Sequence, residues 1–437
     1  MNPHEERAPR IDASIRPAEA IGMYGLFKLA MGGADLEKAL ETLLAMGRST
    51  PDDLAIPYDL FLLYFTMERV AEMEEAGNRA LAAQRLYRIG GPSGPPAADS
   101  VSLRVLALVA EGSPTYNVPI DFILSGTDVR LDFLYLGAGE PLPAAVPEHD
   151  LVFIALSEPD LNLALLQRLA RIAPSWPRPV VNDPARIAPL SRDGVYALLN
   201  GAEGIAIPPS VRLPRAAVER IAAGEPGAWE TAAAGLSFPL IVRPLGSHAG
   251  KQLEKIADAA ELRAYLSEIA AAEAADFYLA PFIDYRSADG RFWKYRVMFI
   301  GGEPFLCHLA ISDHWMIHYV NADMAGSAAK RAEEARAMKE FDQAFALRHA
   351  AAFRELNRRL GLDYFGIDCA ETPDGRLLIF EADTAMVIHA LDSAELYPYK
   401  QEQMAKTFAA FRQFLIRKAG EAPGLPSRPP ESGGRPA

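Results

Sequence analysis

Residues 363–383 read as a β-hairpin, and this segment constrains the fold more than any other part of the chain. Residues 377–380 are continuously apolar, which is typical of a buried strand. Residues 372–375, Thr-Pro-Asp-Gly, form a strong turn signal, because proline presets φ and glycine accepts a positive φ. Folding the chain about this turn predicts two antiparallel strands.

Three acidic side chains fall on this hairpin. Glu381 and Asp383 are two positions apart and therefore share one face of their strand. Asp368 lies roughly opposite residues 379–381, and in two of the three registers it faces the same side as Glu381. Converging carboxylates repel each other and titrate abnormally unless a cation lies among them. Because hard oxygen ligands suit Mg²⁺ or Mn²⁺, Asp368, Glu381 and Asp383 are predicted metal ligands. The alternative is a solvated strand end whose acids face water.

Length and charge limit the classes of protein to consider. A chain of 437 residues exceeds one compact core, so two or three domains are expected. The net charge of −13 argues against nucleic acid or an anionic membrane as the partner. Cys307 and Cys369 give no disulfide framework and suit a reducing compartment. We see no signal peptide and no apolar stretch near the ~18 residues of a membrane span, so a cytoplasmic protein is expected.

Composition divides the chain into successive segments. A charged beginning precedes a region rich in Ala, Leu, Met and Glu at helical spacing, for which a tetratricopeptide-like helix-pair repeat stays open. A Gly/Pro linker comes next, and strands then alternate with helices, which predicts a parallel αβ layer. The segments are 1–17 disordered, 18–90 helical domain, 91–100 linker, 101–185 αβ domain, 186–418 mixed lobes, and 419–437 disordered Pro/Gly-rich tail.

A glycine-containing loop follows a predicted strand that ends in a cation. Gly246 and Gly250 let the backbone approach a phosphate, and Ser247 can donate to its oxygens. Arg243, on the strand that enters the loop, could pair with an α- or β-phosphate. Lys251 is a second candidate cation. The alternative is a common surface turn with a solvated lysine.

Two further groups of side chains are candidate ligand contacts. Lys294 and Arg296 share one strand face and can bracket an anion, although a solvated basic face remains the alternative. Three of the eight histidines fall within residues 308–318, and their spacing matches no metal-binding motif. We expect His308, His314 and Trp315 to contact substrate; packed or surface side chains are the alternative.

In chain order, these motifs resemble the ATP-grasp superfamily, in particular ligases such as glutathione synthetase and the ribosomal-protein glutamate ligases. The resemblance covers roughly residues 100–415. Residues 101–185 are similar to the αβ domain that precedes the ATP-binding lobes. Residues 179–184, 191–193 and 207–210 resemble the start of the first lobe. The implied fold is α+β / α/β, an ATP-grasp fold preceded by a pre-ATP-grasp αβ domain and an N-terminal all-helical domain.

The resemblance also implies roles for individual residues. Adenine would lie at the hinge, residues 279–284, with its edge read by backbone groups and its ribose contacted by Asp284. Arg296 falls on the arginine that touches phosphate or acyl phosphate and is the predicted catalytic residue. The implied nucleotide-binding residues are Arg243, Gly246, Ser247, Gly250, Lys251, Ala280, Phe282, Asp284 and Lys294, and the implied magnesium ligands are Asp368, Glu381 and Asp383.

The chain departs from the family pattern at four places. The family usually has lysine at Arg243 and asparagine at Asp383, and the acidic residue common at the hinge is replaced by Ala280 and Pro281. It commonly has lysine directly after the Arg-Asp pair, where this chain has Gly194. That position leaves the site one phosphate cation short, unless Lys251 or Lys294 replaces it.

The implied activity is ATP-dependent, ADP-forming carboxylate–amine ligation through an acyl phosphate, with ATP and Mg²⁺ (or Mn²⁺) as cofactors. The implied substrates are small-molecule or peptide carboxylates and amines. The N-terminal helices could recruit a peptide or protein partner, and a homodimer stays open. The alternatives are a catalytically divergent nucleotide-binding regulatory or scaffold protein, and an ATP-grasp kinase that stops after phosphoryl transfer.

Overall fold

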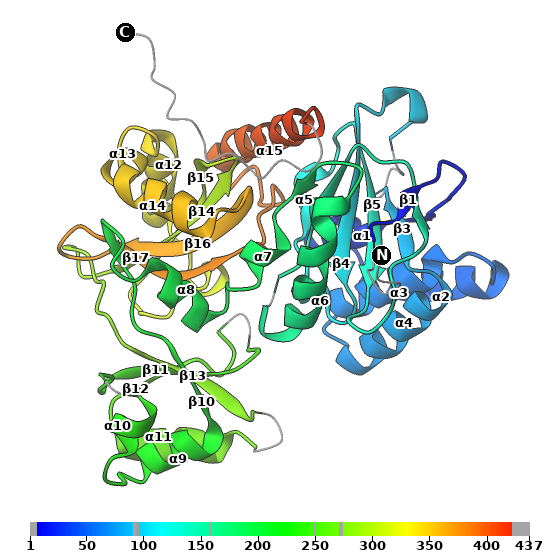
Figure 1. Cartoon of the computed structure of the whole chain (residues 1–437). Coiled ribbons are helices and arrows are strands. Elements are labelled where there is room, and N and C mark those ends of the chain that lie inside the picture. The colour runs from blue at the N-terminus through cyan, green and yellow to red at the C-terminus, as the bar shows by residue number, and fades with distance from the viewer. Residues whose placement is uncertain are drawn as a thin grey trace.

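The computed structural model describes residues 7–90, 94, 96–157, 159–233, 235–247, 250–270 and 274–421 (Figure 1). These residues form sheets of six, five and four strands and one two-stranded pair, with helices packed against them. The mixed architecture confirms the predicted α+β / α/β class. The predicted tail lies outside the described residues from residue 422 onward, as do residues 1–6 and most of the Gly/Pro-rich start of the linker.

A six-stranded sheet forms the αβ domain. Its neighbours pair in parallel except for β3 and β5, which are antiparallel. Strands β4 and β7 are buried along nearly their whole length, as their continuous apolar runs predict. The spatial order is β2 (Ala18–Ala20), β3 (Leu86–Ile89), β5 (Val129–Leu136), β4 (Leu103–Ala110), β7 (Leu151–Ile154) and β8 (Val180–Val181).

Four helices occupy the chain between β2 and β3. They share one hydrophobic cluster with this sheet, in which Leu26, Phe61 and Leu62 lie with Val105 and Val109. The helices are α1 (Gly22–Met31), α2 (Leu36–Ser49), α3 (Ala55–Thr66) and α4 (Val70–Ala83). The predicted helical segment therefore begins and ends on strands of the αβ sheet, and we propose that it is part of this domain.

Shorter elements complete the αβ domain. Residues expected at a disordered N-terminus form β1 (Arg10–Ile11), which pairs in parallel with β6 (Ala145–Val146). Helix α6 (Pro159–Ile172) follows β7, where sequence periodicity predicts a helix. The remaining helices of this domain are α5 (Ile120–Leu124) and α7 (Pro184–Ile187), whereas α8 (Arg192–Leu199) comes next in the chain and packs against elements of the other two large sheets.

The small lobe is an antiparallel four-stranded sheet covered by three helices (Figure 1). Buried residues of the sheet and helices, such as Val218, Leu240 and Leu262, form a hydrophobic cluster of their own. The strand order is β10 (Val211–Pro214), β13 (Asp276–Pro281), β11 (Leu240–Pro244) and β12 (Glu254–Ile256); the helices are α9 (Arg215–Ala222), α10 (Ala228–Ala232) and α11 (Ala259–Glu268).

The five-stranded sheet contains the predicted hairpin as β16 (Tyr364–Glu371) and β17 (Leu377–Asp383). Asp368 lies directly opposite Glu381, and the register shifts at the next residue. The order is β15 (Glu303–Ser312), β14 (Phe292–Ile300), β16, β17 and β9 (Ile205–Ala206), with only β17 and β9 parallel. Its helices are α12 (Ala328–Glu340), α13 (Phe345–Arg348) and α14 (Ala350–Leu360).

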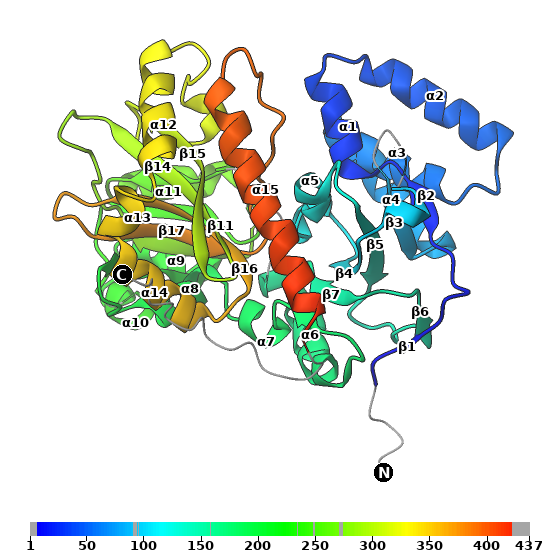
Figure 2. The ribbon, with the colours of Figure 1, turned by 90° about the horizontal axis from the view of Figure 1, so that it is seen from above.

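The last helix, α15 (Pro398–Ala419), lies between the five-stranded sheet and the αβ domain (Figure 2). Its Phe411 ring is 5.9 Å from Phe153 of β7 and 5.0 Å from Tyr364 of β16, measured between ring centroids. At the end of β8, Asn182 exchanges two 2.8 Å hydrogen bonds with the backbone of Tyr364. These contacts fix the hairpin relative to the αβ sheet.

None of the helices in the described segments is long and apolar enough to cross a membrane.

Candidate active site

A cavity of about 630 Å³ lies where the six-, five- and four-stranded sheets approach one another. The loops that follow β4 and β7 line one side, which is where open αβ sheets bind ligands. The small lobe contributes its glycine loop and its hinge, and the five-stranded sheet contributes strands β14, β16 and β17. The hairpin acids, the glycine loop, the pair Lys294 and Arg296, and the histidine-rich segment therefore each contribute residues to one cavity.

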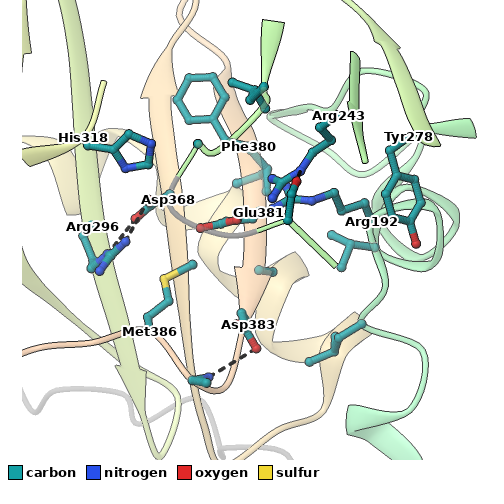
Figure 3. A pocket seen from close by; sticks show the side chains of 18 of the residues that line it. Arg192, Arg243, Tyr278, Arg296, His318, Asp368, Phe380, Glu381, Asp383 and Met386 are labelled. Carbon is teal, nitrogen blue, oxygen red and sulfur yellow. Dashed lines mark hydrogen bonds and ion pairs between the residues drawn. The ribbon is translucent and has the colours of Figure 1, made fainter. Parts of the chain in front are cut away.

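Asp368 lies at the centre of a buried ion cluster on the five-stranded sheet. Its carboxylate accepts hydrogen bonds from Lys294 Nζ at 2.9 Å and from Arg296 Nε and Nη2 at 2.8 and 3.0 Å (Figure 3). Burial alone would raise the pKa of Asp368, but the charges of Arg296 and Lys294 hold it well below its usual value. Burial likewise opposes the charge of Arg296, while Asp368 raises the pKa of that guanidinium. The two predicted anion-binding cations are thus paired with a predicted metal ligand.

The other two acids have separate partners. Glu381 accepts a hydrogen bond from Arg192 Nη2 at 2.8 Å, and this cation overrides burial to lower the pKa of Glu381. Asp383 accepts from Ser157 Oγ at 2.5 Å and from the backbone N–H of Ala385 at 3.2 Å. Burial raises the pKa of Asp383 despite these bonds. All three acids line the cavity, but each is held by a different part of the chain.

This donor set does not fit a preformed three-carboxylate magnesium site. Both oxygens of Asp368 already accept bonds from cations. Within the residues the structure describes, no group of three Asp, Glu, His or Cys side chains is arranged to hold a metal ion. The structure brings Asp368 and Glu381 face to face as the hairpin predicts, yet surrounds Asp368 with positive charge.

The described residues of the glycine loop contribute to the wall of the cavity. Arg243 at the end of β11 donates to Ser247 Oγ at 3.1 Å, and both line the cavity with Gly246 and Gly250. A Cβ at Gly250 would clash with the His318 imidazole, so this glycine lets the loop reach the opposite wall. Burial, and then the charge of Lys294, lower the pKa of His318. Lys251, by contrast, is exposed and is not among the residues that line the cavity.

The hinge after β13 forms another wall. Ala280 and Phe282 line the cavity as predicted. Phe282 packs against Trp315 with ring centroids 5.8 Å apart, and Lys255 Nζ lies 3.7 Å from the Phe282 ring centroid. Asp284, the predicted ribose contact, lies outside the lining and is paired with Arg286. The structure therefore supports two of the three hinge residues as cavity residues.

In the histidine-rich segment, too, some of the predicted residues line the cavity and others do not. Trp315 lines the cavity, and so does His318, which was not among the predicted substrate contacts. His308 packs on Tyr319 with ring centroids 4.9 Å apart, and His314 is exposed. Neither His308 nor His314 is part of the cavity lining. Of the three predicted residues, Trp315 therefore lines the cavity and the two histidines do not.

Arg192 is a site cation that sequence reasoning missed. It begins α8 in the Ser-Arg-Asp motif, whose Ser191 hydroxyl accepts the N–H of Gly194. A Cβ at Gly194 would clash with the carbonyl oxygen of Pro189, so no lysine side chain fits there. Arg192, two residues earlier, instead points its guanidinium at Glu381 (Figure 3). The sequence feature that could have identified this cation was the arginine of the Ser-Arg-Asp motif.

No family model and no curated protein matches this chain. Among solved structures it is similar to the VanG D-Ala:D-Ser ligase from Enterococcus faecalis (17% identity, TM-score 0.45, 72% of this chain and 99% of that one). It is also similar to a RimK domain ATP-grasp protein from Sphaerobacter thermophilus (15%, 0.42, 72% and 99%) and to D-alanine–D-alanine ligase from Bacillus anthracis complexed with ATP (13%, 0.38, 74% and 100%).

Proposed function

We propose that this chain is an ATP-dependent, ADP-forming carboxylate–amine ligase of the ATP-grasp type. The observation that carries the proposal is the convergence of four cations from three parts of the chain on one cavity beneath a glycine loop. These cations are Arg192, Arg243, Lys294 and Arg296. A polyphosphate is the ligand that best matches several cations with backbone N–H donors.

Apolar and cationic residues line different parts of the cavity, and this distribution would orient ATP. The backbone and side chains of residues 280–283 offer a mostly apolar slot for adenine, next to the rings of Phe282 and Trp315. Arg243 and Ser247 then reach the phosphates from the small lobe, and Arg192 and Lys294 reach them from the opposite side. The terminal phosphate would lie close to Arg296, between the two larger sheets.

Two transfer steps follow from this placement. A carboxylate oxygen of the first substrate attacks the γ-phosphorus, the bond to the bridging oxygen breaks, and ADP leaves. Arg296 stabilises the charge on the resulting acyl phosphate electrostatically. An amine then attacks the acyl carbon, inorganic phosphate leaves with the bonding electrons, and the ammonium proton is lost, which yields an amide. Closure of the loop on His318 would exclude water from the acyl phosphate.

Magnesium is implied by the resemblance, and it would neutralise phosphate charge where it is bound. The described carboxylates do not form a ready site for it, since Asp368 is neutralised by Lys294 and Arg296. Glu381 and Asp383 remain proposed ligands, and their role depends on nucleotide being present.

The experiment is a product assay on the full chain with ATP, Mg²⁺ and a panel of carboxylate and amine pairs. We expect release of ADP and inorganic phosphate in equal amounts that depends on both substrates. Arg243→Gln should lower kcat/KM for ATP by about 100-fold, in the range of losing a charged contact to phosphate. Arg286→Gln is the matched control, because Arg286 pairs with Asp284 in the connection between β13 and β14 and does not line the cavity.

Two outcomes would contradict the proposal. Phosphate that appears on the substrate rather than in solution would show a kinase. Tight ATP binding without turnover across the panel would show a nucleotide-binding regulatory protein. The second outcome is a specific alternative, because Gly194 excludes the usual lysine and Asp368 is already paired with cations.

A further inference from the structure

Two N-terminal helices and α5 contribute only apolar side chains to the cavity, and we call this part of the lining the apolar end. Helix α1 contributes Met23 and Phe27, α3 contributes Phe65, and α5 contributes Phe122. Met386 and Val387, just after β17, face the same cavity. No polar or charged residue of α1, α3 or α5 is among the described residues that line it.

This apolar end is joined directly to the charged centre. Arg296 Nη1 donates to the carbonyl oxygen of Val387 at 3.0 Å, while its other nitrogens hold Asp368. Asp383 accepts the N–H of Ala385 at 3.2 Å. The segment that carries Met386 and Val387 is therefore fixed to the same residues that surround the proposed reacting groups.

The helices hold the apolar end in a defined shape. The Phe27 ring lies 5.6 Å from the Phe122 ring at 69°, and 6.4 Å from the Phe65 ring. The first turn of α1 is anchored by two buried carboxylates. Asp59 accepts the N–H groups of Ile21 and Gly22 at 3.0 and 3.3 Å, and Asp121 accepts that of Tyr24 at 2.8 Å. A wall held in this way is preorganised for a ligand.

Met23, Phe27 and Phe65 are only half-buried in the protein, although each is a large apolar side chain. Ligand sites combine such an apolar wall with a few polar groups that fix orientation. Here the polar groups are Arg296, Glu381 and Asp383, which line the same cavity beside the apolar residues. A substrate whose reacting group lies among these residues would extend its remainder toward the helices.

We propose that the apolar end binds an aromatic or branched aliphatic group of the carboxylate or amine substrate, so that the N-terminal helices determine substrate specificity. The inference rests on the proposed ligase function for the reaction but concerns binding alone. It gives the helical segment a role in the site, with Phe27 and Phe65 as specificity-determining residues.

The test compares matched probes that differ by one phenyl group. L-phenylalanine is paired with L-alanine, 3-phenylpropionate with propionate, and phenethylamine with ethylamine. Binding to the full chain is measured by calorimetry with and without a non-hydrolysable ATP analogue. We expect at least one phenyl-bearing probe to bind about tenfold or more tightly than its short partner, as apolar pockets discriminate by this order.

Substitutions at the apolar end test whether the phenyl group binds there. Phe27→Asp should remove the preference for the phenyl group and leave affinity for the ATP analogue unchanged. Leu29→Asp, on an exposed position of the same helix, is the matched control and should keep the preference. Val387→Asp places a carboxylate at the same end on a 47% exposed residue, so it tests the site even where Phe27→Asp fails to fold.

Equal affinities within every probe pair would overturn the inference, and so would a preference that survives both Phe27→Asp and Val387→Asp. Failure of the proposed function looks different: no substrate pair would release ADP and inorganic phosphate in the product assay, while the phenyl preference could still be measured by calorimetry.

Discussion

Gly250 joins the small lobe to the wall formed by residues 315–318. Its φ of +71° lies in the left-handed region, where a side chain is strained. A Cβ there would also clash with His318. Gly246 has a similar φ of +73° but open space around it. Substitutions at the two glycines therefore share the backbone strain, and only the one at Gly250 adds the clash.

We expect Gly250→Ala to raise KM for ATP more than Gly246→Ala does. Both changes bear a backbone cost of about 1 kcal/mol, but only the first pushes the loop away from His318. The double variant Gly250→Ala/His318→Ala should recover KM to the level of Gly246→Ala. Steady-state kinetics with varied ATP check this, and a double variant no better than Gly250→Ala would refute the clash.

At the level of single residues, the sequence predicted three of the four cations that line the described cavity, because Arg243, Lys294 and Arg296 stand in motifs with local spacing. It could not show that Lys294 and Arg296 pair with Asp368, because Asp368 lies 74 and 72 residues further along the chain, respectively. It also missed Ser157, whose hydroxyl reaches Asp383 across 226 residues of sequence. Contacts between distant strands have no local pattern.

The hairpin of β16 and β17 was predictable as an element. Its turn residues and apolar run predicted the two strands and left three registers open, and the structure pairs Asp368 with Glu381 beside a register shift. The N-terminal end of the αβ sheet was not predictable. Strands β2 and β3 have three and four residues and lie beside long helical runs, so they were included in a helical segment.

The end of β16 offers a pH-dependent test at the scale of elements. Glu371 connects β16 to the junction of α13 and α14, through Arg348 at 3.0 Å and His349 at 3.2 Å. His349 and Arg348 lower the pKa of Glu371 from 4.5 to about 2. A carboxylate with a depressed pKa stabilises the folded state above its unfolded pKa, and this stabilisation is lost as pH falls from 4.5 toward 2.

Glu371→Gln should therefore lower the free energy of unfolding by about 1 kcal/mol at pH 7, after allowance for partial exposure. The difference from the unmodified protein should shrink at pH 3. Urea unfolding at both pH values measures it. Glu340→Gln, at an exposed position on α12, is the control and should cause no such pH-dependent difference. An equal loss at both pH values would show that packing, not charge, is responsible.

At the scale of the whole molecule, one hydroxyl joins three parts of the chain. Tyr278 on β13 of the small lobe donates to Asp160 at 2.8 Å and lies 3.3 Å from Asp193 of α8. Asp160 belongs to α6 of the αβ domain and also pairs with Arg212 of β10 at 3.3 Å. Burial, followed by the bond to Asp160, raises the pKa of Tyr278, so the phenol stays protonated and keeps donating.

These hydrogen bonds hold the small lobe against the αβ domain. They therefore set the distance between the two walls of the cavity that these parts form. The lobe has its own hydrophobic cluster, so it can move as a unit when these contacts break.

Tyr278→Phe removes the hydroxyl and preserves the ring. We expect a larger radius of gyration by small-angle X-ray scattering without nucleotide, and a KM for ATP several-fold higher, because binding must then close the lobe. Saturating ATP analogue should restore the compact form. Tyr265→Phe is the matched control, since its hydroxyl bonds to Gln252 within the small lobe. Equal scattering curves for both variants would mean that the hydroxyl of Tyr278 does not hold the lobe, and that the cavity is shaped by Arg212 and the covalent hinge alone.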